Sequence, residues 1–238
     1  MRRKLDVAGV FERIFATYRD QAGLLIPAAL VVFVPIALLN GLVYTTDSPF
    51  AALAAALIGA IGTVWFQGMV VEATRDILDG RRDYTLGSLF ASVSPVLLPL
   101  LVVGILAGIG IGIGLVLLIV PGLILLTWWA LVAPVVVVER PGILPSFGRS
   151  RALVRGNGWQ VFGVIVVLFL LQLILSGIIQ AIAIAVSDSF GAFAIADLVV
   201  RVLVAPLAAL AAATMYFELL DLRREPSAAA APEPAAPA

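Results

Sequence analysis

Residues 96–138 read VLLPLLVVGILAGIGIGIGLVLLIVPGLILLTWWALVAPVVVV, without one charged side chain. A helix needs about 20 mainly apolar residues to cross a bilayer core roughly 30 Å thick. This run is about twice that length, so one span does not account for it. Pro121-Gly122 divides the run, and a Pro-Gly pair is typical of a turn. We therefore predict two antiparallel spans joined by a tight turn.

Apolar runs of similar length lie on both sides of this stretch. The chain is 62% hydrophobic and only 13% charged, whereas a soluble domain carries about 25% charge. The sequence predicts an all-α, polytopic membrane helix bundle with six transmembrane helices, at about residues 24–44, 50–71, 96–120, 123–138, 159–186 and 193–215. The membrane domain is expected to occupy residues 1–224. Residues 225–238 are rich in Pro and Ala and are expected to form a disordered cytoplasmic tail.

The positive charges predict the orientation. Of the 15 Lys and Arg residues, all except Arg201 lie in the two termini or in the loops after the second and fourth spans. The three opposite connections contain none. Because basic loops stay in the cytoplasm, we expect both termini there. The abundance of Ala and the use of Arg in place of Lys are typical of GC-rich bacteria, which indicates a bacterial cytoplasmic membrane.

A pattern repeats three times along the chain. Each third contains a helix of amphipathic character, a span, a tight turn, a second span and then Glu72, Glu139 or Glu218. The amphipathic segments include residues 5–20 and a short helix beginning near Thr85. This repeat predicts three helical hairpins, each preceded by an amphipathic helix on the cytoplasmic side.

Small residues in the third span indicate close helix packing. Gly104, Gly108 and Gly112 form two overlapping GxxxG pairs, which allow two helix backbones to approach. A nucleotide-binding loop is excluded, because no strand precedes these glycines and they lie inside a span.

Polar residues form a predicted seam between the last two spans. Gln172, Ser176 and Gln180 are each four apart on the fifth span, as are Asp197 and Arg201 on the sixth. Ionisable groups inside a membrane are costly and suggest function. Two interpretations remain open, namely a site for a substrate or lipid headgroup, and hydrogen bonds that only hold the two helices together.

The loop before the fifth span is the most basic internal segment. Arg149, Arg151, Arg155 and Trp159 are expected near the membrane surface. Arg can pair there with anionic headgroups, so we expect contact with lipids or with a protein partner.

The chain contains no His and no Cys. It therefore lacks the commonest general base, the usual zinc ligands and a disulfide framework. We expect no metal, no cofactor, no nucleic-acid partner and no enzymatic activity.

Two segments resemble a known family. PGLILLTWWALVAPVVVVE (121–139) and GRSRALVRGNGW (148–159) are similar to the membrane domain found with some glycerophosphoryl diester phosphodiesterases, and MYFELLDLRRE (215–225) is similar to its end. The resembling positions are Pro121, Gly122, Pro134, Glu139, Arg149, Ser150, Leu153, Arg155, Gly156, Trp159, Tyr216, Leu222 and Arg223. The resemblance implies a six-helix membrane domain. It does not carry over the phosphodiesterase activity, which in that family belongs to a separate soluble barrel with His residues that this chain lacks.

These features favour a non-enzymatic scaffold or accessory subunit that binds membrane lipids, another membrane protein or further copies of itself. The alternative is a small-solute or lipid transporter, or another lipid-handling protein, that uses the polar seam.

Overall fold

The computed structural model describes residues 4–44, 46, 48–78, 85–186 and 190–228, and within these ranges every regular element is a helix. In chain order the elements are α1 (Val7–Tyr44), α2 (Pro49–Leu78), α3 (Leu86–Val93), a 3₁₀ turn (Ser94–Val96), α4 (Leu97–Leu117), α5 (Ile119–Trp128), α6 (Val132–Val138), α7 (Ile143–Val154), α8 (Gly158–Val186) and α9 (Phe190–Ala228). The predicted all-α fold is confirmed. α9 continues to Ala228, so residues 225–228 of the predicted tail are helical. Residues 229–238, the loop arginines Arg81 and Arg82 and the turn at 187–189 lie outside the described residues.

Six segments of the described chain are long and apolar enough to cross a membrane. They are Val7–Val43, Pro49–Ile77, Gly87–Leu117, Ile119–Val138, Gly158–Val186 and Gly191–Arg223. The predicted number of spans is therefore confirmed.

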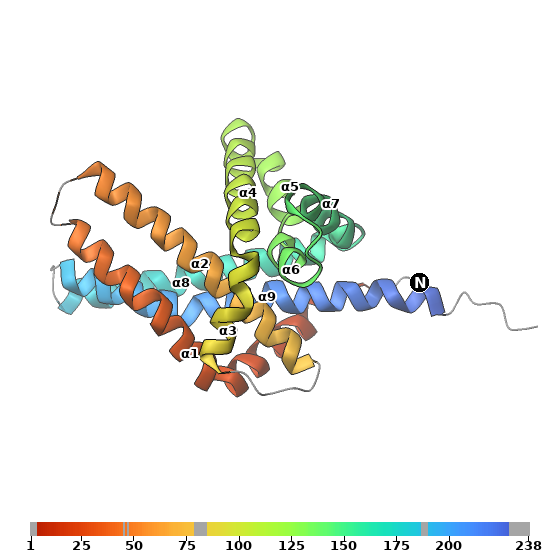
Figure 1. Cartoon of the computed structure of the whole chain (residues 1–238), viewed down its shortest axis with the longest axis horizontal. Coiled ribbons are helices and arrows are strands. Elements are labelled where there is room, and N and C mark those ends of the chain that lie inside the picture. The colour runs from red at the N-terminus through yellow and green to blue at the C-terminus, as the bar shows by residue number, and fades with distance from the viewer. Residues whose placement is uncertain (1–3, 45, 47, 79–84, 187–189, 229–238) are drawn as a thin grey trace, which may run out of the picture.

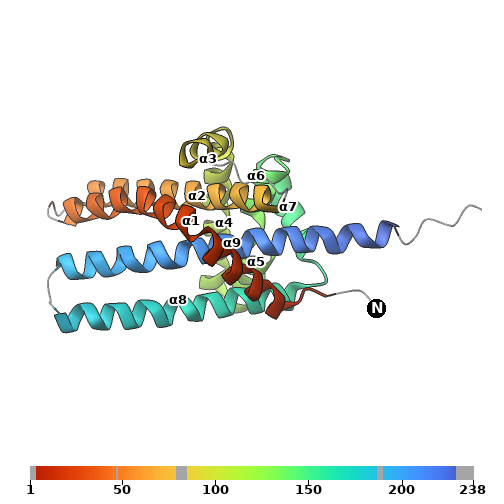
Figure 2. The same ribbon diagram turned by 90° about the horizontal axis from the view of Figure 1, so that it is seen from below.

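The spans form three hairpins that diverge from one another. In Figure 1, α8 and α9 run horizontally, α4 runs vertically, and α1 and α2 lie diagonally between these directions. Figure 2, turned by 90°, shows α1, α2, α8 and α9 running across the view while α4 is seen nearly end-on. Helix α9 lies at the centre and packs against α1, α2 and α8. The hairpins are thus splayed rather than stacked in parallel.

Helix α1 corrects one prediction. The amphipathic segment at residues 5–20 was expected to precede a separate span at 24–44, but residues 7–44 form one helix. Val10 and Ile14 are fully buried inside the protein, and Arg13 Nε lies 2.9 Å from Glu218 Oε1 of α9. Part of the apolar face of this segment therefore packs within the bundle, whereas Phe15 stays 49% exposed. Helix α1 changes direction along its length (Figure 2) and contains Pro27 and Pro35, each of which removes a backbone hydrogen bond and favours a bend.

The other amphipathic helices lie where the repeat requires them. Helix α3 begins after Thr85, whose hydroxyl accepts a hydrogen bond from the Ser88 backbone N–H. Helix α7 precedes the third hairpin as α3 precedes the second. The three repeated glutamates also behave alike, because each forms an ion pair with an arginine: Glu72 with Arg75, Glu139 with Arg149 and Glu218 with Arg13.

The turn between α4 and α5 differs from the predicted one. The chain turns at Leu118, which has extended backbone angles, and not at Pro121-Gly122. Pro121 lies in the first turn of α5, where the absent N–H needs no helical partner. Gly122 is needed because a Cβ there would lie 2.6 Å from the Leu115 backbone nitrogen of α4. The Pro-Gly pair therefore marks the start of the returning helix and its close contact with α4.

The fourth span is broken. It was predicted as one helix over residues 123–138, but α5 ends at Trp128 and α6 begins at Val132. Ser150 of α7 joins the two parts: its hydroxyl donates to the Trp128 carbonyl (2.7 Å) and accepts from the Leu131 N–H (3.3 Å). These bonds satisfy backbone groups that the break leaves without helical partners.

The glycines of α4 pack in a different register from the predicted one. A Cβ at Gly108 or Gly112 would meet nothing within 4 Å, and one at Gly104 would make only an ordinary contact. In contrast, a Cβ at Gly110 would lie 2.6 Å from the Trp129 ring, and one at Gly114 would lie 2.9 Å from the Gly122 Cα. Close packing on α4 is therefore confirmed, but the predicted stripe was wrong.

Candidate functional site

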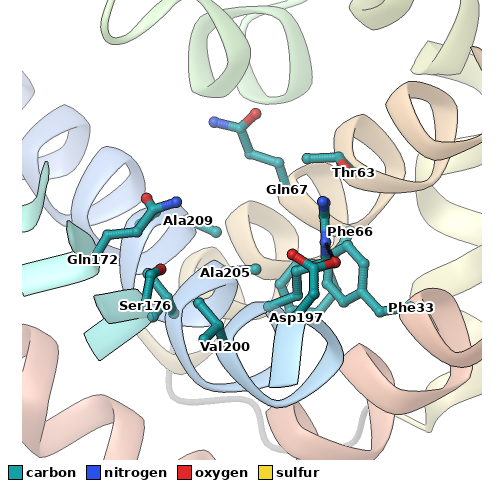
Figure 3. Close-up of a pocket in the computed structure, with 13 residues that line it drawn as sticks. Phe33, Thr63, Phe66, Gln67, Gln172, Ser176, Asp197, Val200, Ala205 and Ala209 are labelled. Atoms are coloured by element: carbon teal, nitrogen blue, oxygen red, sulfur yellow. Dashed lines mark hydrogen bonds and ion pairs between the residues drawn. The ribbon is translucent and has the colours of Figure 1, made fainter. Parts of the chain in front are cut away.

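A cavity of about 340 Å³ lies between α1, α2, α8 and α9 (Figure 3). Polar side chains from three helices line it: Thr63 and Gln67 from α2, Gln172 and Ser176 from α8, and Asp197 and Arg201 from α9. Phe33, Phe66 and several small residues of α9 complete the wall. Figure 3 shows Gln67 and Gln172 facing the same space from opposite sides. The cavity therefore offers hydrogen-bond donors, acceptors and both signs of charge.

Asp197 and Arg201 carry the charge of this site. They are one helical turn apart on α9, with Arg201 Nε 2.6 Å from Asp197 Oδ2. Nearly half of each side chain is exposed, 49% for Asp197 and 47% for Arg201. The pair is therefore neutral as a unit but accessible, so a ligand can still form hydrogen bonds with either partner.

The structure brings together four of the five residues of the predicted polar seam. Gln172, Ser176, Asp197 and Arg201 all line the cavity. Gln180 does not, and within the described part of the chain its Oε1 atom is buried without a hydrogen-bond partner.

Two polar residues of the cavity were absent from the predicted seam. Thr63 and Gln67 lie four residues apart on α2, which is the spacing that identified the stripe on α8. The signal was therefore present in the sequence, but nothing in it indicated that α2 turns this face toward α8 and α9. The Thr63 hydroxyl also donates to the Gly59 carbonyl at 2.9 Å.

An apolar cavity of about 370 Å³ adjoins the polar one. The two cavities share the lining residues Gln67, Gln172, Val204 and Ala208. The remaining wall of the apolar cavity comes from α8, α9 and the α5–α6 segment: Leu126, Ala130, Ile165, Leu168, Phe169, Leu171, Leu207, Ala211, Ala212 and Met215. A polar compartment and an apolar compartment thus lie next to each other inside the bundle.

The structure separates the four residues predicted to contact lipid or a partner into two groups, Arg149 on the one hand and Arg151, Arg155 and Trp159 on the other. Arg149 is engaged within the protein: its Nε donates to both carboxylate oxygens of Glu139, at 2.9 and 2.7 Å. This hydrogen bonding raises the pKa of the Arg149 guanidinium. The buried Tyr216 donates to the same carboxylate at 3.0 Å. Arg149 therefore joins α7 to the end of α6 and to α9, and this is a structural role.

The other three residues of that surface are more accessible. The Arg151 guanidinium lies over the Trp128 ring, 4.0 Å from its centroid, and Arg151 itself is exposed. Arg155 is also exposed, and its carbonyl accepts a hydrogen bond from Arg223 of α9 at 3.1 Å. Trp159 is 83% exposed at the start of α8. These residues are thus more accessible to lipid or a partner than Arg149, whose guanidinium is held by Glu139.

The described residues contain no group of three or more Asp or Glu side chains positioned to hold a metal ion. The fold and the six apolar helices define a multi-pass helical membrane protein. Neither a family model, nor a curated protein, nor a solved structure matches this chain.

Proposed function

We propose that this protein binds a membrane lipid, or a similar amphiphilic molecule, in the two adjoining cavities between α2, α8 and α9. The observation that carries the proposal is the contact between a polar compartment and an apolar one, through four shared lining residues. A polar solute would fill only the polar compartment and would leave the apolar compartment empty. A molecule with a polar head and a hydrocarbon tail suits both.

The order of residues along α9 gives the bound molecule a direction. Asp197 and Arg201 line the polar end, and Ala212 and Met215 line the apolar end nearer to Glu218. Arg201 lies 17 residues before Glu218, or about 25 Å along the helix. The headgroup would therefore lie far from the arginine-rich loops. If those loops are cytoplasmic, the lipid is oriented as in the outer leaflet.

The cavity supports lipid handling more specifically than a passive scaffold. A passive scaffold does not require polar side chains inside its membrane spans. Gln67 lies only five residues before Glu72, about 8 Å along α2, and Thr63 lies one turn further into the span. Together with the broken α5–α6 span, which is a feature of many transporters, these residues favour a ligand inside the bundle. The activity that we propose is lipid binding without covalent chemistry. We also propose that the chain is related to the membrane domain found with some glycerophosphoryl diester phosphodiesterases.

Lipid copurification tests the proposal. The full chain is extracted with its surrounding membrane in polymer-bounded discs, and bound lipids are compared with bulk lipids by mass spectrometry. We expect one lipid class to be enriched. The Gln172→Leu variant, which removes hydrogen bonds of about 1–1.5 kcal/mol each, should weaken retention of this lipid by about tenfold.

Gln180→Leu is the matched control, because Gln180 is on the same helix and outside the cavity. It should retain the lipid as the parent does. The proposal is wrong if no lipid is enriched, or if folded Gln172→Leu and Gln180→Leu proteins retain it equally. A double Asp197→Leu, Arg201→Leu variant provides a second test, with complete loss of the enriched lipid expected.

A further inference from the structure

A separate cleft of about 660 Å³ lies between α5 and the beginning of α8. It shares no lining residue with the two central cavities. Its walls are mainly apolar. Helix α5 contributes Val120, Leu123, Ile124, Thr127 and Trp128, and α8 contributes Gly158, Trp159, Gln160 and Phe162. Lys4 and Gly156 complete the lining. Any ligand of this cleft is therefore distinct from the proposed ligand of the central cavities.

Positive charge gathers at one end of the cleft. Lys4 is held there because the Leu5 backbone N–H donates to Asn157 Oδ1, at 3.0 Å, just before α8 begins. Arg151 is not itself a lining residue, but its guanidinium lies 4.0 Å from the ring centroid of Trp128, which lines the cleft. No carboxylate is among the residues that line the cleft. The first N–H groups of α8 add the partial positive charge of a helix N-terminus.

The rest of the cleft suits a hydrocarbon chain. Val120 lies eight residues before Trp128, or about 12 Å along α5, and the lining between them is apolar apart from Thr127. Trp159 is 83% exposed beside the basic end. An exposed Trp next to basic residues is typical of the interface between hydrocarbon and headgroups. The charged end and the apolar wall therefore follow the order of groups in a membrane lipid.

We infer that the α5–α8 cleft binds an anionic phospholipid from the leaflet next to the arginine-rich loops. Its phosphate contacts Lys4 and Arg151, and one acyl chain lies along Leu123 and Phe162. The charge complementarity selects an anionic lipid over a zwitterionic one. The apolar wall selects a lipid over free phosphate. This inference stands independently of the proposed function, because it uses other residues and the opposite end of the bundle.

Native mass spectrometry of the purified full chain tests the inference. Delipidated protein is given equal amounts of phosphatidylglycerol and phosphatidylcholine with the same acyl chains. We expect preferential binding of phosphatidylglycerol by the parent. Each basic residue near the surface contributes about 1 kcal/mol, so a Lys4→Gln, Arg151→Gln double variant should bind phosphatidylglycerol about 30-fold more weakly.

Arg75→Gln is the control outside the cleft; it removes one positive charge from a partly exposed arginine that does not line the cleft. It should keep the preference for phosphatidylglycerol. Inorganic phosphate at millimolar concentration should not displace the lipid. The inference is overturned if the parent binds both lipids equally, if the double variant keeps the preference, or if phosphate alone competes. Circular dichroism and monodisperse elution establish that each variant is folded.

Discussion

Helices α4 and α5 approach closely at Gly122, and Gly122→Ala tests this contact directly. A Cβ at position 122 would lie 2.5 Å from Leu115 Cγ and Cδ2, and 2.6 Å from the Leu115 backbone nitrogen. Nonbonded carbon atoms prefer about 3.5–4.0 Å. The two helices would therefore have to separate by about 1 Å, because a backbone atom cannot rotate away as a side chain can.

The expected cost follows from two opposing terms. Overpacking of this kind costs about 1–3 kcal/mol. Replacement of Gly by Ala inside a helix contributes up to about 1 kcal/mol in the other direction. The net effect of Gly122→Ala is therefore a destabilisation of up to about 2 kcal/mol, and its difference from a Gly→Ala change without overpacking is about 1–3 kcal/mol.

Gly112→Ala is the matched control on the opposing helix. A Cβ there would meet nothing within 4 Å, so only the gain in helix propensity remains. This variant should be as stable as the parent or up to about 1 kcal/mol more stable. Both variants change one hydrogen to a methyl group, and only their surroundings differ.

The measurement is unfolding of the purified chain in detergent by increasing sodium dodecyl sulfate, followed by far-ultraviolet circular dichroism. The midpoint should fall for Gly122→Ala and stay or rise for Gly112→Ala. Equal midpoints for the two variants would refute the close contact between α4 and α5. A fall for Gly112→Ala alone would show that the predicted GxxxG stripe, rather than the observed one, makes the contact.

Two further outcomes are expected. Tyr216→Phe removes a hydrogen bond to the Glu139 carboxylate and should lower stability by about 1.5–3 kcal/mol. Tyr18→Phe is its control and should cost nothing in the same unfolding assay, because among the described residues the buried Tyr18 hydroxyl has no partner; equal losses would contradict the Tyr216 contact. For orientation, the chain contains no Cys, so single cysteines can be placed at Thr46 and Gly148. A membrane-impermeant maleimide should label Thr46→Cys in intact cells and Gly148→Cys only after the membrane is opened, and the reverse pattern would refute the predicted topology.

The candidate site shows where sequence reasoning reached its limit. Spacing on a single helix correctly placed Gln172 with Ser176 and Asp197 with Arg201. It could not show that Gln67 of α2 faces the same cavity, because that depends on the rotation of α2 about its own axis. It also placed Gln180 in the seam, although this residue lies beyond the cavity wall.

The residues of the basic loop before α8 were also only partly predictable from the sequence. Four residues were predicted to contact lipid or a partner because they are basic or aromatic and lie near a span. The structure assigns Arg149 to Glu139 within the protein, since α7 folds back against α6 and α9. Lys4, far away in sequence, lines the α5–α8 cleft together with Trp159.

The sequence by itself determined the helical class, the six apolar segments and their grouping into hairpins. Hydropathy and run length are local properties, and a bilayer permits few alternatives for a long apolar segment. Only the tertiary structure decided the turn at Leu118, the break between α5 and α6, and the Gly110–Gly114 packing stripe. Each depends on how one helix is rotated and tilted against another, and neighbouring side chains set those quantities. The residues around the central cavities and the α5–α8 cleft were brought together by the same packing.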